Sequence, residues 1–302
     1  MLKFRTFIIA TLLLVCNQLA VSEAAKKKAS PAPNARIQTS LVVDGKTGEV
    51  LHAKNAHAKI YPASLAKGMT LYMLFESIAS GKISLNDDFH VSEAATKALP
   101  CKLHLKAGEK IKVKDAILAL VVRSANDVAY VIAENVAGSE QKFIKLMTQR
   151  ARQLGMNNTN FTNASGWHDP KQVSTAADMA KLYMALKRDF PQYHHFCSKT
   201  SFVFKGKPVH GHNRVLANYP GATGGKTGFT NPAGFNLVIE STRNGKSLIA
   251  VVTGSHSWAS RDKKMVSLLD EHFGIKNEPA GIKKPVKSKK SNAKIKLASN
   301  KK

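Results

Sequence analysis

The sequence is poor in cysteine and in acidic residues, and its apolar runs are short. Among 302 residues there are 3 cysteines, and 20 acidic residues stand against 46 lysines and arginines, which gives a net charge of +26. The apolar run at residues 7–15 is too short to span a bilayer. The histidines, including His210 and His212, lack a third ligand at a recognisable spacing, so we expect neither a metal site nor a bound cofactor.

The N-terminus has the pattern of a secretory signal. Lys3 and Arg5 precede the short apolar run, and small residues around Ala24 provide a cleavage site. We therefore assign residues 1–24 to a signal peptide and expect export to the periplasm or the cell-wall space.

Removal of the signal would leave two cysteines, Cys101 and Cys197. In an oxidising compartment they could form at most one disulfide, and their separation in the sequence leaves that question open. A lipoprotein signal built on Cys16 is disfavoured because Val15 stands where that motif has a small residue.

Basic, low-complexity segments flank the central part of the chain. We predict a linker over residues 25–37 and a disordered tail over residues 276–302, where ten lysines accompany Glu278 alone. Nucleic acid is disfavoured as a partner because the chain carries an export signal and no nucleic-acid-binding motif. An anionic wall or membrane surface suits the tail better, which would make any membrane contact peripheral, and a basic binding protein for such polymers is our non-enzyme alternative.

Three short motifs suggest an active-site serine enzyme. In the first, Ser64 and Lys67 are three residues apart, so on a helix their side chains share a face. A lysine can remove the proton of a serine only if burial or nearby positive charge lowers the pKa of the lysine. Ser64 would lie in the first turn, where free backbone N–H groups can polarise a carbonyl oxygen.

The other two motifs provide the remaining polar groups of such a site. Ser124 could relay a proton to a leaving amine, and the Asn126 carboxamide could both donate to and accept from a substrate amide. In Lys226-Thr227-Gly228, a cation and a hydroxyl suit a substrate with a free carboxylate, and the Lys226 charge would help to keep Lys67 neutral.

Each motif also has an ordinary structural interpretation. A serine three residues before a lysine is common, and residues 124–127 could cap the junction between two helices, at residues 117–122 and 128–137. The tripeptide Lys-Thr-Gly also occurs at residues 46–48, between the strand-like residues 40–43 and 49–53, where it is typical of a hairpin turn. We assign no chemistry to this earlier copy.

The three motifs in this order are those of penicillin-binding proteins and class A β-lactamases. Over roughly residues 39–273 the chain resembles the low-molecular-mass penicillin-binding proteins of the D-alanyl-D-alanine carboxypeptidase family. Further segments carry this resemblance: Tyr61-Pro62-Ala63, Asn160-Phe161-Thr162-Asn163 with Gly166, residues 174–180, Asn213-Arg214 and Phe229-Thr230.

The resemblance implies removal of the terminal D-alanine from peptidoglycan stem peptides, with β-lactam antibiotics as covalent inhibitors. It makes Ser64 the acylated nucleophile and Lys67 its base, with the N–H groups of Ser64 and Phe229 as the oxyanion hole. Cleavage of D,D cross-links by the same chemistry is the alternative activity. The longer members have a second β-rich domain and an amphipathic anchoring helix, and we expect neither here.

Efficient hydrolysis of β-lactams is not expected. It needs a glutamate on a loop between the second and third motifs, but only Glu134 and Glu140 occur there, within or just after the helix that follows Asn126. Asp169 is an acid on a loop, and we interpret it as a turn residue.

The fold class implied is α/β and β-lactamase/transpeptidase-like, in one catalytic domain over residues 38–275. Strands near both ends of the domain, at residues 40–53, 235–240 and 248–252, flank a mainly helical middle. This order predicts one antiparallel sheet built from both ends and covered by helices, with a helical subdomain inserted and the active site in the cleft between them. A helix over roughly residues 258–273 would cover the sheet.

Overall fold

The structure is a computed structural model that describes residues 36–275. The predicted signal peptide, nearly all of the predicted linker and the lysine-rich tail lie outside the described residues. Within residues 36–275, no helix is both long enough and apolar enough to cross a membrane.

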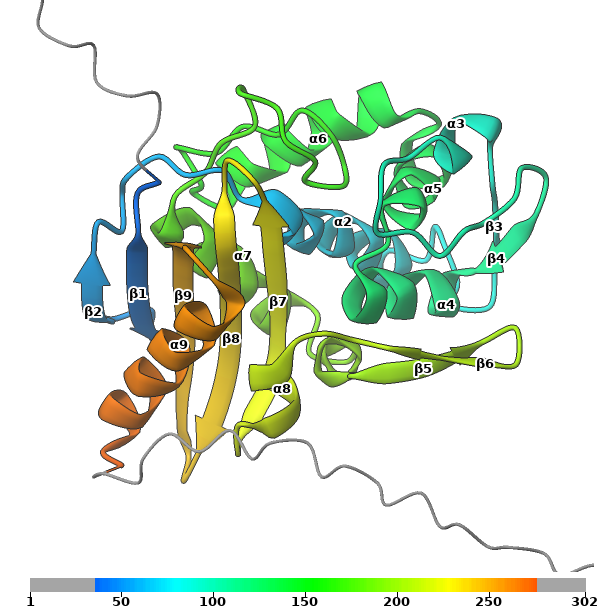
Figure 1. The fold of residues 1–302 in the computed structure, drawn as a ribbon. Coiled ribbons are helices and arrows are strands. Elements are labelled where there is room, and N and C mark those ends of the chain that lie inside the picture. Colours follow the sequence, from blue (N-terminus) through cyan, green and yellow to red (C-terminus); the bar gives the residue numbers. More distant parts are fainter. Residues whose placement is uncertain (1–35, 276–302) are drawn as a thin grey trace, which may run out of the picture. The chain divides into compact units, whose positions relative to one another are not determined.

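The centre of the fold is a five-stranded antiparallel sheet with the order β2-β1-β9-β8-β7 (Figure 1). Because β1 pairs along its length with β9, the first strand of the domain is joined to the last, as predicted. The strands are β1 (Thr39–Asp44), β2 (Val50–Lys54), β7 (Ala222–Thr230), β8 (Gly234–Arg243) and β9 (Lys246–Ser255).

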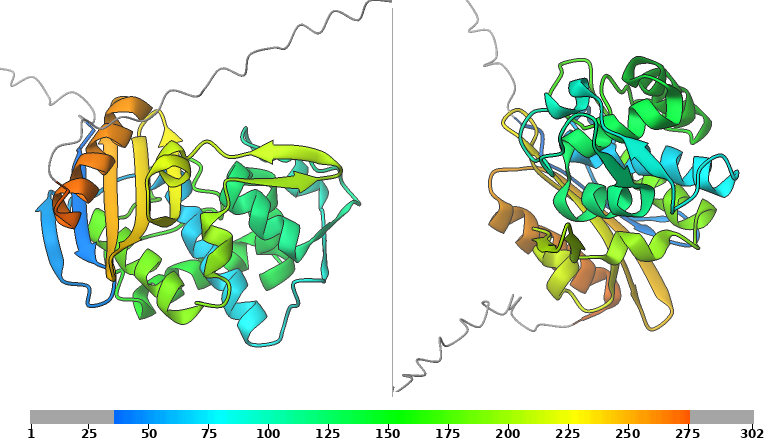
Figure 2. Two further views of the ribbon diagram at one scale, coloured as in Figure 1. Left: turned by 90° about the horizontal axis from the view of Figure 1, so that it is seen from below. Right: turned by 90° about the vertical axis from the view of Figure 1, so that its right-hand side faces the viewer.

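Side chains of the central strands alternate between two apolar layers, since successive residues of a strand point to opposite faces. Leu248, Ala250 and Val252 join the core beneath α9 (Trp258–Phe273), which confirms the predicted C-terminal helix. Ile249 and Val251 join the larger core with α2 (Lys67–Ala79) and α7 (Ala176–Asp189) on the other face. The sheet therefore lies between α9 and the helical middle of the chain (Figures 1 and 2).

The helical middle is the predicted insertion between β2 and β7. It begins with the short 3-10 helix η1 (Ala63–Ala66), which runs directly into α2. Its other elements and those that lead to β7 are α3 (Glu93–Thr96), α4 (Val113–Leu118), η2 (Ala119–Arg123), α5 (Asn126–Ala137), α6 (Glu140–Gln153), η3 (His194–Ser198) and α8 (Arg214–Asn218). Two small two-stranded sheets complete the described fold: β3 (Asp88–His90) pairs with β4 (Lys110–Lys112), and β5 (Ser201–Phe204) forms a hairpin with β6 (Lys207–His210). Figure 2 shows the β5–β6 hairpin reaching away from the sheet alongside the helices.

The two Lys-Thr-Gly copies have different structures. The copy at residues 46–48 forms the turn between β1 and β2, as predicted: the Asp44 carboxylate accepts from the N–H groups of Lys46 and Thr47, and Gly48 has a φ of 79°. The later copy lies in β7, an edge strand that the glycine-rich sequence does not predict. Pairing with β8 and contact with η1 hold this segment extended despite its low strand propensity.

Candidate active site

Ser64 and Lys67 meet at the junction of η1 and α2. The Lys67 Nζ atom lies 3.0 Å from Ser64 Oγ. Lys67 is only 1% exposed, whereas Ser64 keeps an accessible side in the cleft. The predicted pair is therefore in contact, with the nucleophile open to substrate and the base shielded from water.

The surroundings of Lys67 favour its neutral form. Burial is the main cause of a pKa well below the usual lysine value, and the nearby Lys226 charge lowers this pKa further. Two carbonyl oxygens, Asn126 Oδ1 at 2.6 Å and the backbone oxygen of Ser165, accept from Nζ. A neutral amine has two N–H donors and one lone pair, so these two acceptors leave the lone pair for the Ser64 hydroxyl. This is the arrangement that a general base requires.

Ser124 reaches the site from a left-handed backbone conformation. Its φ is 59° at the end of η2, a conformation that costs a non-glycine residue energy and turns the chain sharply into α5. Ser124 ends η2 and Ala125 is the N-cap of α5, so these residues do join two helices as the structural interpretation predicted, but the Ser124 side chain does not cap α5. Its hydroxyl instead accepts from Lys226 Nζ at 2.8 Å. Burial lowers the pKa of Lys226 to about 7, so this lysine is not the permanent cation that its residue type suggests.

Asn126 joins the base to the loop between α3 and β4. Its Oδ1 accepts from Lys67, and its Nδ2 donates to the backbone oxygens of Leu99 and Pro100, at 3.2 and 2.6 Å. The sequence predicted a contact from this amide to the substrate. In the structure both of its N–H groups face protein carbonyls, so that contact would require one of them to be released.

The edge strand β7 forms one wall of the site. Gly228 lies against η1, since a Cβ atom there would be 3.0 Å from the Pro62 oxygen and 3.2 Å from the Ser64 nitrogen. A larger residue would require β7 or η1 to shift by a few tenths of an ångström, so glycine suits this close approach to the nucleophile. The next residue, Phe229, is 48% exposed, and β7 is an edge strand of the described sheet.

Sequence reasoning missed the role of the loop that carries Ser165. Its carbonyl oxygen is a direct partner of Lys67, and the Asn163 Oδ1 accepts from the backbone N–H of Gly166 at 2.8 Å. Gly166 has a φ of 82°, and a Cβ atom there would lie 2.0 Å from the Ala63 oxygen. Asn163 and Gly166 were noted as part of the family pattern, but a backbone contact has no signature in residue type.

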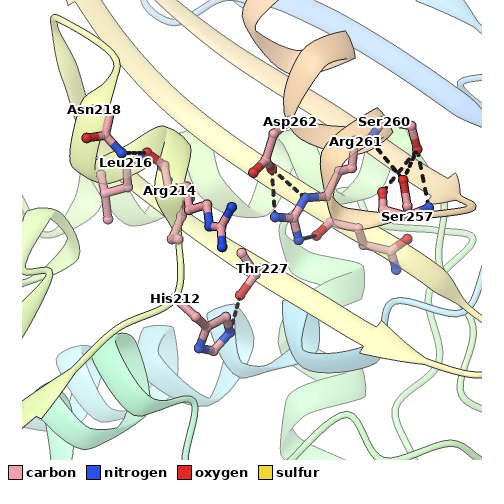
Figure 3. Close-up of polar contacts among 11 residues, drawn as sticks. His212, Arg214, Leu216, Asn218, Thr227, Ser257, Ser260, Arg261 and Asp262 are labelled. Carbon is pink, nitrogen blue, oxygen red and sulfur yellow. Dashed lines mark hydrogen bonds and ion pairs between the residues drawn. The ribbon is translucent and has the colours of Figure 1, made fainter. Parts of the chain in front are cut away.

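A pocket of about 330 Å³ opens over Ser64 and contains the Ser124 and Thr227 side chains. Two arginines, Arg214 and Arg261, add positive charge to it, and sequence reasoning gave Arg261 no role. Arg261 is buried and donates to Asp262 Oδ1 through Nε and Nη2, at 2.8 and 2.6 Å (Figure 3). This pair fixes the guanidinium at the pocket wall.

Both described cysteines are free, which answers the open question of a disulfide. Cys101 is exposed and lines the catalytic pocket, whereas Cys197 is buried. Asp169 accepts from the Lys171 N–H at 2.7 Å, as expected of a turn residue. Glu134 and Glu140 bind the Ser92 hydroxyl and the Ala164 N–H, respectively.

Solved structures share this fold. Penicillin-binding protein 5 from Haemophilus influenzae is 32% identical, with a TM-score of 0.75 over 82% of this chain and 73% of that one. Penicillin-binding protein D2 from Listeria monocytogenes, solved in its cefotaxime-bound form, is 28% identical with a TM-score of 0.71, over 81% of this chain and 100% of that one. The fold class is thus β-lactamase/transpeptidase-like, as predicted.

The sequence comparisons define the family more narrowly. Residues 25–257 match the D-alanyl-D-alanine carboxypeptidase family, and the chain belongs to it. The carboxypeptidase DacC of Escherichia coli is 35% identical over 80% of this chain and 62% of its own length. The carboxypeptidase DacF of Bacillus subtilis is 29% identical over 89% of this chain and 70% of its own length. The chain therefore spans about two thirds of these relatives.

Proposed function

We propose that this protein is a serine D-alanyl-D-alanine carboxypeptidase that removes the terminal D-alanine from peptidoglycan stem pentapeptides. The observation that carries the proposal is the buried Lys67, whose Nζ lies 3.0 Å from Ser64 Oγ and also contacts two carbonyl oxygens. Family membership supports the same activity.

The proposed reaction uses these residues in turn. Lys67 takes the proton of the Ser64 hydroxyl as Oγ attacks the carbonyl carbon of the penultimate D-alanine. The N–H groups of Ser64 and Phe229 stabilise the oxyanion. As the C–N bond breaks, the proton passes through the Ser124 hydroxyl to the leaving amine, and D-alanine departs. Water then hydrolyses the Ser64 ester, which returns the hydroxyl and releases the tetrapeptide.

A free carboxylate on the leaving group distinguishes this substrate from an internal peptide. Thr227, Arg214 and Arg261 line the catalytic pocket, and the buried Lys226 reaches its wall by donating to Ser124 Oγ. A carboxylate there would receive charge-assisted hydrogen bonds, which are the stronger kind. β-Lactams are the expected covalent inhibitors, because Glu134 and Glu140 are bound to Ser92 and Ala164 and do not line the catalytic pocket.

Blocking the terminal carboxylate as an amide should remove most of the activity on a pentapeptide. We expect a loss of roughly ten- to a hundred-fold in kcat/KM, because a charged hydrogen bond is replaced by a neutral one. Chromatographic detection of released D-alanine or D-alanine amide measures both reactions. Equal turnover of acid and amide would show that the cationic side of the pocket does not bind the substrate carboxylate.

We further propose that the protein is exported and that its lysine-rich tail holds it at an anionic wall or membrane surface. Deleting residues 276–302 should leave hydrolysis of a small soluble peptide unchanged, since every residue of the site precedes the tail. At low salt, less of the truncated protein than of the full-length protein should co-sediment with sacculi or anionic vesicles. At high salt the two proteins should sediment equally, because exposed charges are screened. Equal sedimentation of both proteins at low salt would assign the contact to the basic catalytic domain.

A further inference from the structure

A histidine outside the three motifs contacts the hydroxyl that faces the proposed carboxylate site. His212 Nε2 lies 2.8 Å from Thr227 Oγ1 (Figure 3). His212 lines the catalytic pocket, and it also lines a neighbouring pocket of about 240 Å³ between β7, α8 and the base of the β5–β6 hairpin. It is therefore placed where it can control the direction of the Thr227 hydroxyl.

The backbone on both sides of His212 is fixed. The Gly211 N–H donates to the Thr200 oxygen at 2.8 Å, which ties this residue to the start of the hairpin. Asn213 is the N-cap of α8, and its Oδ1 accepts from the Leu216 N–H at 3.1 Å. The ring is thus held against Thr227 by two anchored neighbours and does not depend on a flexible loop.

The electrostatic surroundings keep the ring neutral. The pKa of His212 is lowered to about 4, mainly by burial and in part by the charges of Lys226, Arg261 and Arg123. The carboxylate of Asp262, which lines the same pocket, is bound to Arg261. At neutral pH one ring nitrogen of His212 therefore carries a hydrogen and the other has a lone pair.

The two tautomers have opposite consequences for Thr227. If Nε2 carries the hydrogen, it donates to Oγ1, and the Thr227 hydrogen is free to donate to a carboxylate in the pocket. If Nδ1 carries it, Nε2 accepts the Thr227 hydrogen, and a carboxylate would meet only lone pairs of Oγ1. A bound carboxylate thus selects the Nε2–H tautomer, which completes a chain of two donors that point toward the negative charge.

We propose that His212 is a positioning residue that directs the Thr227 hydroxyl toward the substrate carboxylate and so sets the preference for substrates with a free C-terminus. The inference rests on the proposed carboxypeptidase activity and adds a residue that acts through Thr227 without touching the reacting atoms. A glutamine at this position could still donate from its amide, whereas an alanine could not.

The test compares His212→Ala, His212→Gln and the control His210→Ala on the pentapeptide acid and its amide. His210 is a neighbouring histidine that lines only the second pocket and has no contact with Thr227. We expect His212→Ala to lower kcat/KM on the acid by roughly ten-fold, mainly through KM, with little change on the amide. The kcat/KM of His212→Gln on the acid should stay within a few-fold of the wild-type value. His210→Ala should have the wild-type kcat/KM on both substrates.

A double-mutant cycle with Thr227→Val separates positioning from general damage. Once Thr227→Val has removed the hydroxyl, His212→Ala should cause no further loss of kcat/KM on the acid. The effects of the two substitutions should therefore not add. Equal losses on acid and amide, or additive effects in the cycle, would overturn the inference. Failure of the wild-type protein to release D-alanine would instead overturn the proposed function, and the same cycle would then be read from rates of acylation by penicillin, which also carries a carboxylate.

Discussion

Replacing Lys67 with alanine should slow acylation by a fluorescent penicillin by roughly three to six orders of magnitude. Among the described residues, Lys67 is the base in contact with Ser64, and its Nζ lies 3.0 Å from Oγ. Without it the hydroxyl must lose its proton to water, and a serine hydroxyl alone is a weak nucleophile.

The matched control is Lys46→Ala, which removes the lysine of the other Lys-Thr-Gly tripeptide. Lys46 lies in the exposed β1–β2 turn, so its loss should leave the acylation rate unchanged. Circular dichroism should show that both variants keep the fold. If penicillin acylates Lys67→Ala at a rate within ten-fold of the wild-type rate, another group activates Ser64 and the assignment of the base is wrong.

Gly166→Ala should be among the most damaging single changes outside the three motifs. The residue has a φ of 82°, and an added Cβ would lie 2.0 Å from the Ala63 oxygen and 3.0 Å from the Ser64 nitrogen. Either the loop or the start of η1 must move. We expect a loss of about 3 kcal/mol or more in the free energy of unfolding, which corresponds to a fall of about 6–12 °C in Tm.

The same change should reduce acylation, because the loop that carries Gly166 also supplies the Ser165 oxygen to Lys67. Gly138→Ala is the matched control. Its φ of 78° is similar, but nothing lies within 4 Å of the added Cβ, so only the backbone cost of about 1–2 kcal/mol remains. Thermal unfolding and penicillin labelling of both variants measure the difference, and equal Tm values would contradict the proposed clash.

Much of the fold followed from the sequence because its elements have clear local patterns. The strands around residues 40–53 and the helix Trp258–Phe273 were predicted from the family resemblance and the coarse pattern of the sequence, and the structure confirms them. The strand β7 was missed because its glycines have low strand propensity, and its extended form depends on pairing with β8. Tertiary contacts decided the structure of that segment.

The site was predictable only where side chains carry the chemistry. Ser64, Lys67 and Lys226 could be recognised because their residue types and order suit acyl transfer. The Ser165 contact is made by a backbone oxygen, which any residue could provide. Arg261 is distant in the sequence from the three motifs, and the packing of α9 against β8 and β9 brings it to the pocket.

The central claim is that Ser64 forms the acyl-enzyme, and mass spectrometry of the penicillin-treated protein tests it most directly. Cleavage after Lys59 and Lys67 by trypsin releases residues 60–67, in which Ser64 is the only serine. Our account predicts one penicillin adduct, on this peptide at Ser64, and no adduct in the Ser64→Ala variant. An adduct on another residue, or labelling that persists in Ser64→Ala, would contradict it.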